Sequence, residues 1–185
     1  MLYAVGVSGS PRKGGNTDYL LGVVLGCLRD LGFETRLLRV ADYDVKPCVS
    51  CWTCVERGEC CIDDEMSSII IPEVLKAHVL VLGSPVHFDN VSSFMKTFMD
   101  RTWPLRGRLR GKVGGGCVVG RGYGLDLALA AIHSFMLKHE VILCHRGVRG
   151  VAYRKGEVSM DKRAMDDAAK LAEAVSKVAL KLYEH

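Results

Sequence analysis

Residues 8–17 read Ser-Gly-Ser-Pro-Arg-Lys-Gly-Gly-Asn-Thr, and this stretch decides the fold. It separates a short β-rich run at residues 2–7 from residues 18–31, where leucine and valine recur at helical spacing. The order strand, loop, helix directs the backbone N–H groups of the loop and the positive end of the helix dipole toward one point. We therefore expect an anion to bind at this loop.

The side chains of the loop favour a phosphate as that anion. Its glycines let a ligand approach the backbone closely. Donors for phosphate oxygens come from Ser8, Ser10, Asn16 and Thr17, and positive charge comes from Arg12 or Lys13. A tight connection whose serines and asparagine only cap a helix is the alternative. The number of such residues in one strand-to-helix turn favours an anion site.

Two well-known phosphate motifs fit this loop poorly. Gly9 and Gly14 have the spacing of a P-loop, but Gly15-Asn16 stands where that motif requires Lys followed by Ser or Thr. A dinucleotide-binding Gly-x-Gly-x-x-Gly is also missing, since Gly6 is followed two residues later by Ser8. The loop is therefore of another kind.

The rest of the chain alternates strands and helices. Further strands are expected at residues 34–40, 78–83, 112–119 and 141–144, and further helices at 67–77, 91–101, 125–139 and 159–184. This alternation predicts an α/β fold with a doubly wound, five-stranded parallel sheet, strand order 2-1-3-4-5, and helices on both faces. We expect a single domain over residues 1–185, with a cysteine-rich insertion at about residues 46–66.

In such a sheet, ligands bind beyond the carboxyl ends of the strands, where the strand order reverses. The loops that follow strands 1, 3 and 4 are then residues 8–17, 84–90 and 120–124. We expect these three loops to form one site.

Composition excludes several other functions. The chain has 185 residues, 49% of them hydrophobic and 25% charged, which is the balance of a compact globular protein. Its net charge of +4 is dispersed, whereas a nucleic-acid surface needs a broader basic face. The longest apolar runs are strand-sized, so we expect no membrane span. The chain runs from Met1 directly into a strand pattern, which predicts a cytoplasmic protein.

Five of the eight cysteines lie within residues 48–61, in the pattern Cys48-x2-Cys51-x2-Cys54-x5-Cys60 with Cys61 beside it. Zinc sites usually use two separate Cys-x-x-Cys turns, whereas Cys51 would belong to both turns here. A run of this kind suits a cubane [4Fe–4S] cluster. Zinc and reduced free thiols remain alternatives.

The other cysteines, Cys27, Cys117 and Cys144, stand singly in apolar stretches and are expected in the core. The acidic run Asp63-Asp64-Glu65 is interpreted as a solvated turn.

Three groups of residues resemble one known family. They are Gly9–Arg12 with Gly15–Thr17, Gly83–Phe88 with Asn90–Ser92 and residues 95–101, and Gly120–Gly124. These motifs are similar to those of the flavodoxin-like NAD(P)H-dependent flavin reductases and, more narrowly, of the iron-sulfur flavoproteins of anaerobic archaea and bacteria. The resemblance spans most of the chain.

The resemblance implies that the chain binds FMN. It gives the phosphate to Ser10, Pro11, Arg12, Gly15, Asn16 and Thr17, beside the donor Ser8 already named. It gives the isoalloxazine ring to Ser84, Pro85, Val86, His87 and Phe88, and the polar edge of the ring to Gly120, Arg121 and Gly122. Relatives often have Tyr-Phe-Gly where this chain has His87-Phe88-Asp89. The resemblance also implies a [4Fe–4S] cluster on Cys48, Cys51, Cys54 and Cys60, and leaves Cys61 without a role.

FMN accepts two electrons together or one at a time, whereas a cubane cluster moves one. The leading hypothesis is therefore an electron-transfer oxidoreductase with a ferredoxin-like donor and small acceptors such as dioxygen, peroxide or quinones. No side chain is assigned as a catalytic acid or base. The family arrangement implies a homodimer or homotetramer. The alternatives are an NAD(P)H-dependent FMN or quinone reductase without a cluster, and a non-enzymatic zinc or flavin sensor.

Overall fold

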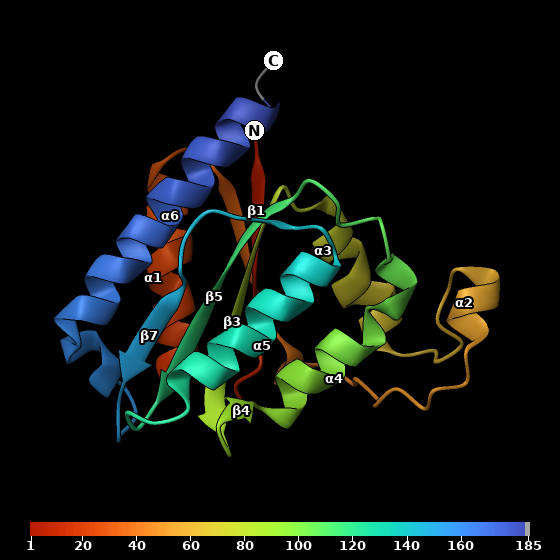
Figure 1. The fold of residues 1–185 in the computed structure, drawn as a ribbon, viewed down its shortest axis with the longest axis horizontal. Coiled ribbons are helices and arrows are strands. Elements are labelled where there is room, and N and C mark those ends of the chain that lie inside the picture. Colours follow the sequence, from red (N-terminus) through yellow and green to blue (C-terminus); the bar gives the residue numbers. More distant parts are fainter. Residues whose placement is uncertain (184–185) are drawn as a thin grey trace.

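A computed structural model describes residues 1–183 and shows one seven-stranded sheet with helices on both sides (Figure 1). The strands are β1 (Tyr3–Ser8), β2 (Glu34–Arg39), β3 (Val79–His87), β4 (Asn90–Val91), β5 (Val113–Gly120), β6 (Ile142–Leu143) and β7 (Val148–Val151). The α-helices are α1 (Asn16–Asp30), α2 (Thr53–Arg57), α3 (Ile71–Lys76), α4 (Ser93–Arg101), α5 (Leu125–Lys138) and α6 (Lys162–Tyr183).

The predicted parallel sheet is confirmed, with one difference at its edge. The order is β2-β1-β3-β5-β6, and β7 also pairs with β5. The predicted fifth strand corresponds to β6, which pairs in parallel with the start of β5, and an additional strand that was not predicted, β7, pairs with the end of β5. The interruption between β6 and β7 has a local cause, since Gly147 adopts a positive φ of 82° and its N–H donates to His145 Nδ1. This turn offsets the chain before it rejoins the sheet.

Three other elements differ from the sequence-based expectation. β3 extends to His87, because its parallel pairing with β5 continues to Pro85 and Val86 then pairs antiparallel with β4. The helix expected at residues 67–77 begins as a π-helical turn, Met66–Ile70. The cysteine segment contains α2, which lies away from the sheet in Figure 1.

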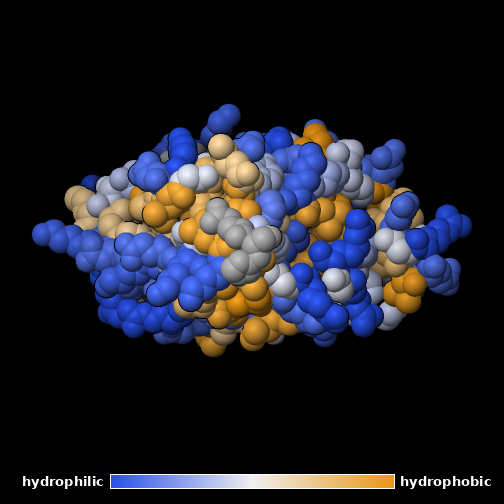
Figure 2. All heavy atoms as spheres, turned by 90° about the horizontal axis from the view of Figure 1, so that it is seen from above, coloured by the Kyte–Doolittle hydropathy of each residue, from blue (hydrophilic) through white to orange (hydrophobic). Residues whose placement is uncertain are grey.

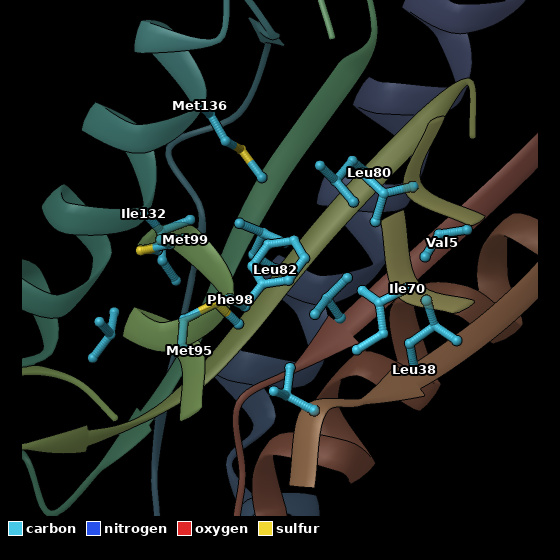
Figure 3. Packing of buried hydrophobic residues seen from close by; sticks show 14 of the residues in the cluster. Val5, Leu38, Ile70, Leu80, Leu82, Met95, Phe98, Met99, Ile132 and Met136 are labelled. Carbon is cyan, nitrogen blue, oxygen red and sulfur yellow. The ribbon is translucent and has the colours of Figure 1, made fainter. Parts of the chain in front are cut away.

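Apolar side chains fill the space on both faces of the sheet. Helices α1 and α6 cover one face, and α3, α4 and α5 cover the other (Figure 1). On the second face, Phe98 and Met95 of α4 pack with Leu80 and Leu82 of β3 (Figure 3). Burial of this kind is the main stabilising contribution in a domain of this size.

Three successive glycines let the helices approach β5 closely. A Cβ atom on Gly115 would lie 2.5 Å from a methyl carbon of Leu171 in α6, and one on Gly116 would lie 2.7 Å from a methyl carbon of Leu129 in α5. A Cβ on Gly114 would lie 2.8 Å from the carbonyl oxygen of Leu80 in β3. These positions are occupied by neighbours, so the centre of the sheet has no room for side chains there.

The N-terminus and the end of α6 lie together at the amino ends of the strands, opposite the loops expected to bind a ligand (Figure 1). Seen from that end, the surface is mainly hydrophilic, with apolar residues in scattered groups (Figure 2). Between residues 1 and 183, no helix has both the length and the apolar character of a membrane span.

Candidate functional site

A cavity of about 360 Å³ lies at the carboxyl ends of the parallel strands. Loops that follow β1, β3, β5 and β7 contribute to its walls. The lining residues are Ser10, Pro11, Arg12, Gly15, Asn16, Thr17, Pro85, Val86, His87, Val119, Gly120, Arg121, Tyr123, Ala152 and Tyr153. The three loops singled out in the sequence therefore meet around one cavity of a size usual for small-molecule sites.

Four of the residues expected to bind the cofactor do not line this cavity. Ser8 and Ser84 are fully buried, and their hydroxyl groups hold neighbouring loops in place. Ser8 Oγ donates to Asp18, and Ser84 Oγ accepts from the N–H of Ser92 at 2.9 Å. Phe88 is fully exposed at the turn between β3 and β4, and Gly122 lies outside the lining.

The conformation of the first loop, residues 8–17, is held by Asp18, a buried residue in the first turn of α1. Its carboxylate accepts from Ser8 Oγ at 2.5 Å, from the Gly14 N–H at 2.8 Å and from Arg39 Nε at 2.7 Å. The Arg39 guanidinium also donates to the carbonyl of Ser10 at 3.3 Å. Burial acts to lower the pKa of Arg39, but its hydrogen bonds and ion pairs with Asp42 and Asp18 outweigh this and raise it. The loop is thus fixed before any ligand binds.

Gly15 leaves the amino end of α1 open. It is the N-cap residue, and no side chain caps the helix. The N–H groups of a first helical turn have no partner within the helix, so they are available to an anion in the cavity. A Cβ atom on Gly15 would lie 3.0 Å from the carbonyl oxygen of Arg12 and 3.4 Å from Ser10 Oγ. Glycine is therefore the residue that keeps this cradle clear.

The Asn16 side chain makes contacts within the chain that the sequence did not predict. Its amide nitrogen donates to the carbonyl of Arg154 at 2.8 Å, and its oxygen accepts from the N–H of Val158 at 3.4 Å. The side chain therefore connects the first loop to the segment after β7. It lines the cavity while its polar atoms hold the cavity wall.

Two aromatic residues of the lining, Tyr123 and Tyr153, were not predicted. Tyr123 lies within the glycine-rich loop 120–124, so its position in that loop was a usable signal. Tyr153 follows β7, a strand that the sequence pattern did not reveal, and its hydroxyl donates to the carbonyl of Arg121 at 3.1 Å. With Val119 and Ala152, these residues add apolar surface suited to a planar ring.

A second cavity, of about 340 Å³, is lined by the five cysteines of residues 48–61. Its lining includes Cys48, Cys51, Cys54, Cys60 and Cys61, together with Trp52 and Trp103. The backbone turns sharply around it, since Ser50, Trp52 and Gly58 all have positive φ. The predicted cluster ligands are therefore gathered around one space.

The five cysteines line this space, and two of them are in contact. Cys51 Sγ lies 3.2 Å from Cys61 Sγ. Across residues 1–183, no group of three or more His, Cys, Asp or Glu side chains is arranged to hold a single metal ion. A [4Fe–4S] cluster needs four cysteine thiolates, one for each iron atom. The donor set of four thiols around one cavity fits a cluster.

Thiol acidity differs within the cluster of cysteines. Hydrogen bonds from the side chain and backbone of Thr53 lower the pKa of Cys51 to about 7. Burial, followed by the charge of Cys60, raises the pKa of Cys54. The hydrogen bond with Cys51 raises the pKa of Cys61.

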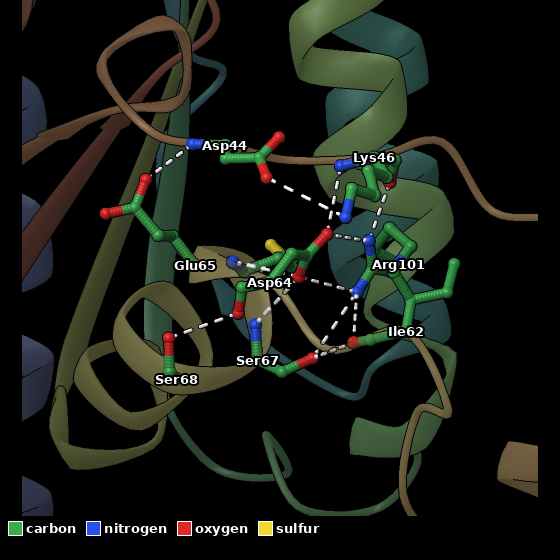
Figure 4. Close-up of polar contacts among 9 residues, drawn as sticks. Asp44, Lys46, Ile62, Asp64, Glu65, Ser67, Ser68 and Arg101 are labelled. Atoms are coloured by element: carbon green, nitrogen blue, oxygen red, sulfur yellow. Dashed lines mark hydrogen bonds and ion pairs between the residues drawn. The ribbon is translucent and has the colours of Figure 1, made fainter.

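The expectation that residues 63–65 form a solvated turn was wrong for Asp64. Its side chain is fully buried and forms an ion pair with Arg101, which is also fully buried (Figure 4). Burial acts to raise the pKa of Asp64, but hydrogen bonds from Arg101 and from the Lys46 N–H outweigh it and lower the pKa. Sequence reasoning missed the pair because its two members are far apart in the chain.

Comparison with known proteins assigns the family. The model of a family described as NADPH-dependent FMN reductase matches residues 3–152. This chain belongs to that family. An iron-sulfur flavoprotein of Methanocaldococcus jannaschii is 37% identical over 185 aligned residues, covering 94% of this chain and 95% of the relative. An iron-sulfur flavoprotein of Archaeoglobus fulgidus is 36% identical, covering 92% of this chain and 79% of the relative.

Solved structures agree on the fold of this FMN reductase family member. RosB with a bound 8-demethyl-8-formylriboflavin-5′-phosphate has a TM-score of 0.83 at 17% identity, covering 100% of this chain and 81% of RosB. A flavodoxin from the domain Archaea has a TM-score of 0.65 at 16% identity, covering 96% of this chain and 99% of the flavodoxin. The predicted flavodoxin-like fold is confirmed. By family, the protein is a flavin-dependent oxidoreductase with FMN as its cofactor.

Proposed function

We propose that this FMN reductase family member transfers single electrons between FMN and a [4Fe–4S] cluster held by Cys48, Cys51, Cys54 and Cys60. The observation that carries the proposal is the cavity around which these four thiols gather. Two relatives aligned over more than nine-tenths of this chain bear the name iron-sulfur flavoprotein, which supports it.

The residues of the first cavity would hold FMN and tune its reduction potential. The open amino end of α1 and the loop fixed by Asp18 suit the phosphate, while Pro85, Val86 and Tyr123 suit the ring. When bound, FMN supplies chemistry in both one- and two-electron steps, and the cluster supplies one-electron steps. The chain's part is to bind and orient the two groups, so no side chain is assigned as a catalytic acid or base.

The proposed donor is a ferredoxin-like protein, and the proposed acceptors are small molecules such as dioxygen, peroxide or quinones. A homodimer or homotetramer is proposed because residues 47–61, the cysteine lobe, stand away from the sheet (Figure 1) and expose Val49, Trp52 and Val55. Such apolar residues suit contact with another copy. Thiolate ligands also need a reducing compartment, which supports a cytoplasmic location.

Anaerobic purification followed by metal analysis tests the proposal. We expect iron and acid-labile sulfide in about equal amounts beside FMN, and broad absorbance near ~400 nm that dithionite bleaches. Cys54→Ser should lose the cluster, whereas Cys27→Ser, a cysteine outside the lobe, should keep it. Flavin peaks without iron or sulfide would contradict the proposal, and stoichiometric zinc would point to the sensor hypothesis.

The family description favours a second candidate, an NADPH-dependent FMN or quinone reductase in which the cysteines hold no cluster. Its distinguishing result is bleaching of the flavin by NADPH alone, at full rate, in a protein whose lobe cysteines are replaced by serine. Loss of flavin reduction in that variant would exclude it.

A further inference from the structure

The neck of the cysteine segment is closed by one buried ion pair. Lys46 and Ile62 flank the segment, residues 47–61, at its two ends. Arg101 Nη1 donates to the Lys46 carbonyl at 2.6 Å, and Arg101 Nη2 is 3.4 Å from the Ile62 carbonyl (Figure 4). Both ends of the segment are therefore held by the same guanidinium group.

The carboxylate of Asp64 completes this closure. It pairs with Arg101 through both oxygens, at 2.6 and 2.9 Å, and accepts from the Lys46 N–H at 2.9 Å. It also accepts from the N–H groups of Met66 and Ser67, at 3.1 and 3.3 Å, where the π-helical turn begins. We call Asp64 and Arg101, with the backbone groups of Lys46 and Ile62, the clasp.

The clasp also joins the cysteine lobe to the body of the domain. Arg101 is the last residue of α4, a helix whose Met95 and Phe98 are buried against the sheet. Asp100 and Trp103, on either side of it in the chain, line the cysteine cavity. Any movement of α4 relative to the lobe would break hydrogen bonds of the clasp.

A purely stabilising role does not account for this arrangement. A buried ion pair is often no better for stability than a well-packed apolar pair, because both charges must lose their hydration. A charged fork that binds both ends of a loop adds geometric specificity, since each of its N–H groups needs an acceptor in a set direction. Closing the ends also removes part of the conformational freedom of the segment.

We infer that the clasp positions the cysteine segment, holding Cys48, Cys51, Cys54 and Cys60 around their cavity before a cluster is assembled there. This inference rests on the proposed function for the identity of the bound group. Arg101 Nε is buried and, within residues 1–183, has no hydrogen-bond partner. The contacts of Arg101 within the clasp are therefore made by Nη1 and Nη2.

The test uses the full chain with FMN bound and compares three variants. Asp64→Asn keeps the shape and removes the charge, and Arg101→Lys keeps the charge and removes the fork. The matched control is Asp167→Asn, which removes a buried carboxylate paired with Arg146 away from the lobe. FMN binding and cooperative unfolding identify variants whose body is intact.

The first readout needs no cluster. The chain has two tryptophans, and both line the cysteine cavity. In a Trp103→Phe background, the fluorescence anisotropy decay of Trp52 reports motion of the lobe. We expect the amplitude of nanosecond motion to rise about twofold or more in both clasp variants, because the lobe is no longer tied at its neck. The control should not change.

The second readout is anaerobic reconstitution with iron and sulfide. We expect clasp variants to take up a cluster with at least about fivefold lower yield or to lose it at least about fivefold faster to an iron chelator. If the parent chain takes up none, the proposed function fails, while the Trp52 readout still tests the clasp. Wild-type behaviour of both clasp variants in the Trp52 readout would overturn the inference.

A double variant covers the case in which the single variants fail to fold. Asp64→Leu with Arg101→Met replaces the pair by apolar side chains and leaves no unpaired buried charge. We expect it to fold, to bind FMN and to show the same loosened lobe. A folded double variant with wild-type Trp52 motion and wild-type cluster uptake would refute the positioning role.

Discussion

Replacing Asp18 with asparagine should weaken both the fold and FMN binding. Asp18 is buried, and it accepts three hydrogen bonds, from Ser8, Gly14 and Arg39. Asparagine has one acceptor oxygen and no charge, so at least one buried donor and the positive charge of Arg39 lose their partner. Removing one member of a buried ion pair typically costs about 3–5 kcal/mol.

The effect on stability is measured by urea unfolding of the FMN-free protein. With a denaturant slope of about 2 kcal/mol/M for a domain of this kind, a loss of about 3 kcal/mol lowers the midpoint by about 1.5 M. Asp30→Asn, an exposed carboxylate at the other end of α1, is the matched control and should change little. A double-mutant cycle with Arg39→Met isolates the energy of the pair.

FMN affinity is measured separately, by quenching of flavin fluorescence without urea. The Gly14 N–H and the Ser8 hydroxyl fix the loop through Asp18, so in the variant the ligand must order the loop itself. We expect the dissociation constant to rise about tenfold or more, equivalent to about 1.4 kcal/mol. An unchanged urea midpoint together with an unchanged dissociation constant would show that the loop does not depend on Asp18.

Three further predictions follow from single contacts. Gly15→Ala should raise the FMN dissociation constant about tenfold, because the new methyl group crowds the cradle; Gly26→Ala, in the open middle of α1, should bind normally and be up to about 1 kcal/mol more stable. The Tyr3 hydroxyl and neighbouring cations lower the pKa of Glu73 from its ordinary 4.5 to about 2. The charged form of Glu73 therefore stabilises the fold fully above pH 4.5. The parent protein should have a higher urea midpoint than Glu73→Gln there, and this difference should vanish as the pH falls from 4.5 to 2. Hydrogen peroxide should convert Cys51 and Cys61 of cluster-free protein to a disulfide, with two waters formed; peptide mass mapping should find this bond, and a predominance of another pairing would contradict the 3.2 Å sulfur contact.

Most of the fold could be predicted from local patterns in the sequence. The loop after β1, the apolar strands and the helical spacing of apolar residues in α1 and α6 each carry their own signal. Strand β7, at the edge of the sheet, carries no such signal, because it contains Arg149 and Gly150 and is separated from β6 by the turn at Gly147. Its place beside β5 is decided by pairing, which a local pattern does not show.

The candidate site could likewise be predicted only in part from the sequence. The meeting of loops 8–17 and 120–124 around one cavity could be predicted, because loops at the carboxyl ends of neighbouring parallel strands lie at the same edge of the sheet. The burial of Asp64 could not be assigned, since an acidic run is usually solvated and its partner Arg101 is distant in sequence. The internal use of the Asn16 side chain likewise depends on Arg154, after β7.

The three glycines of β5 have a consequence for redesign. A Cβ atom on Gly114, Gly115 or Gly116 would lie less than 3 Å from a strand carbonyl or from side chains that pack on the two faces of the sheet. The distance between β5 and the helices packed on it is thus set by residues that carry no side chain. Substitutions meant to change what the protein oxidises or reduces have room in the loops that carry Tyr123 and Tyr153. They have almost none at the three glycines of β5, the strand that precedes Tyr123.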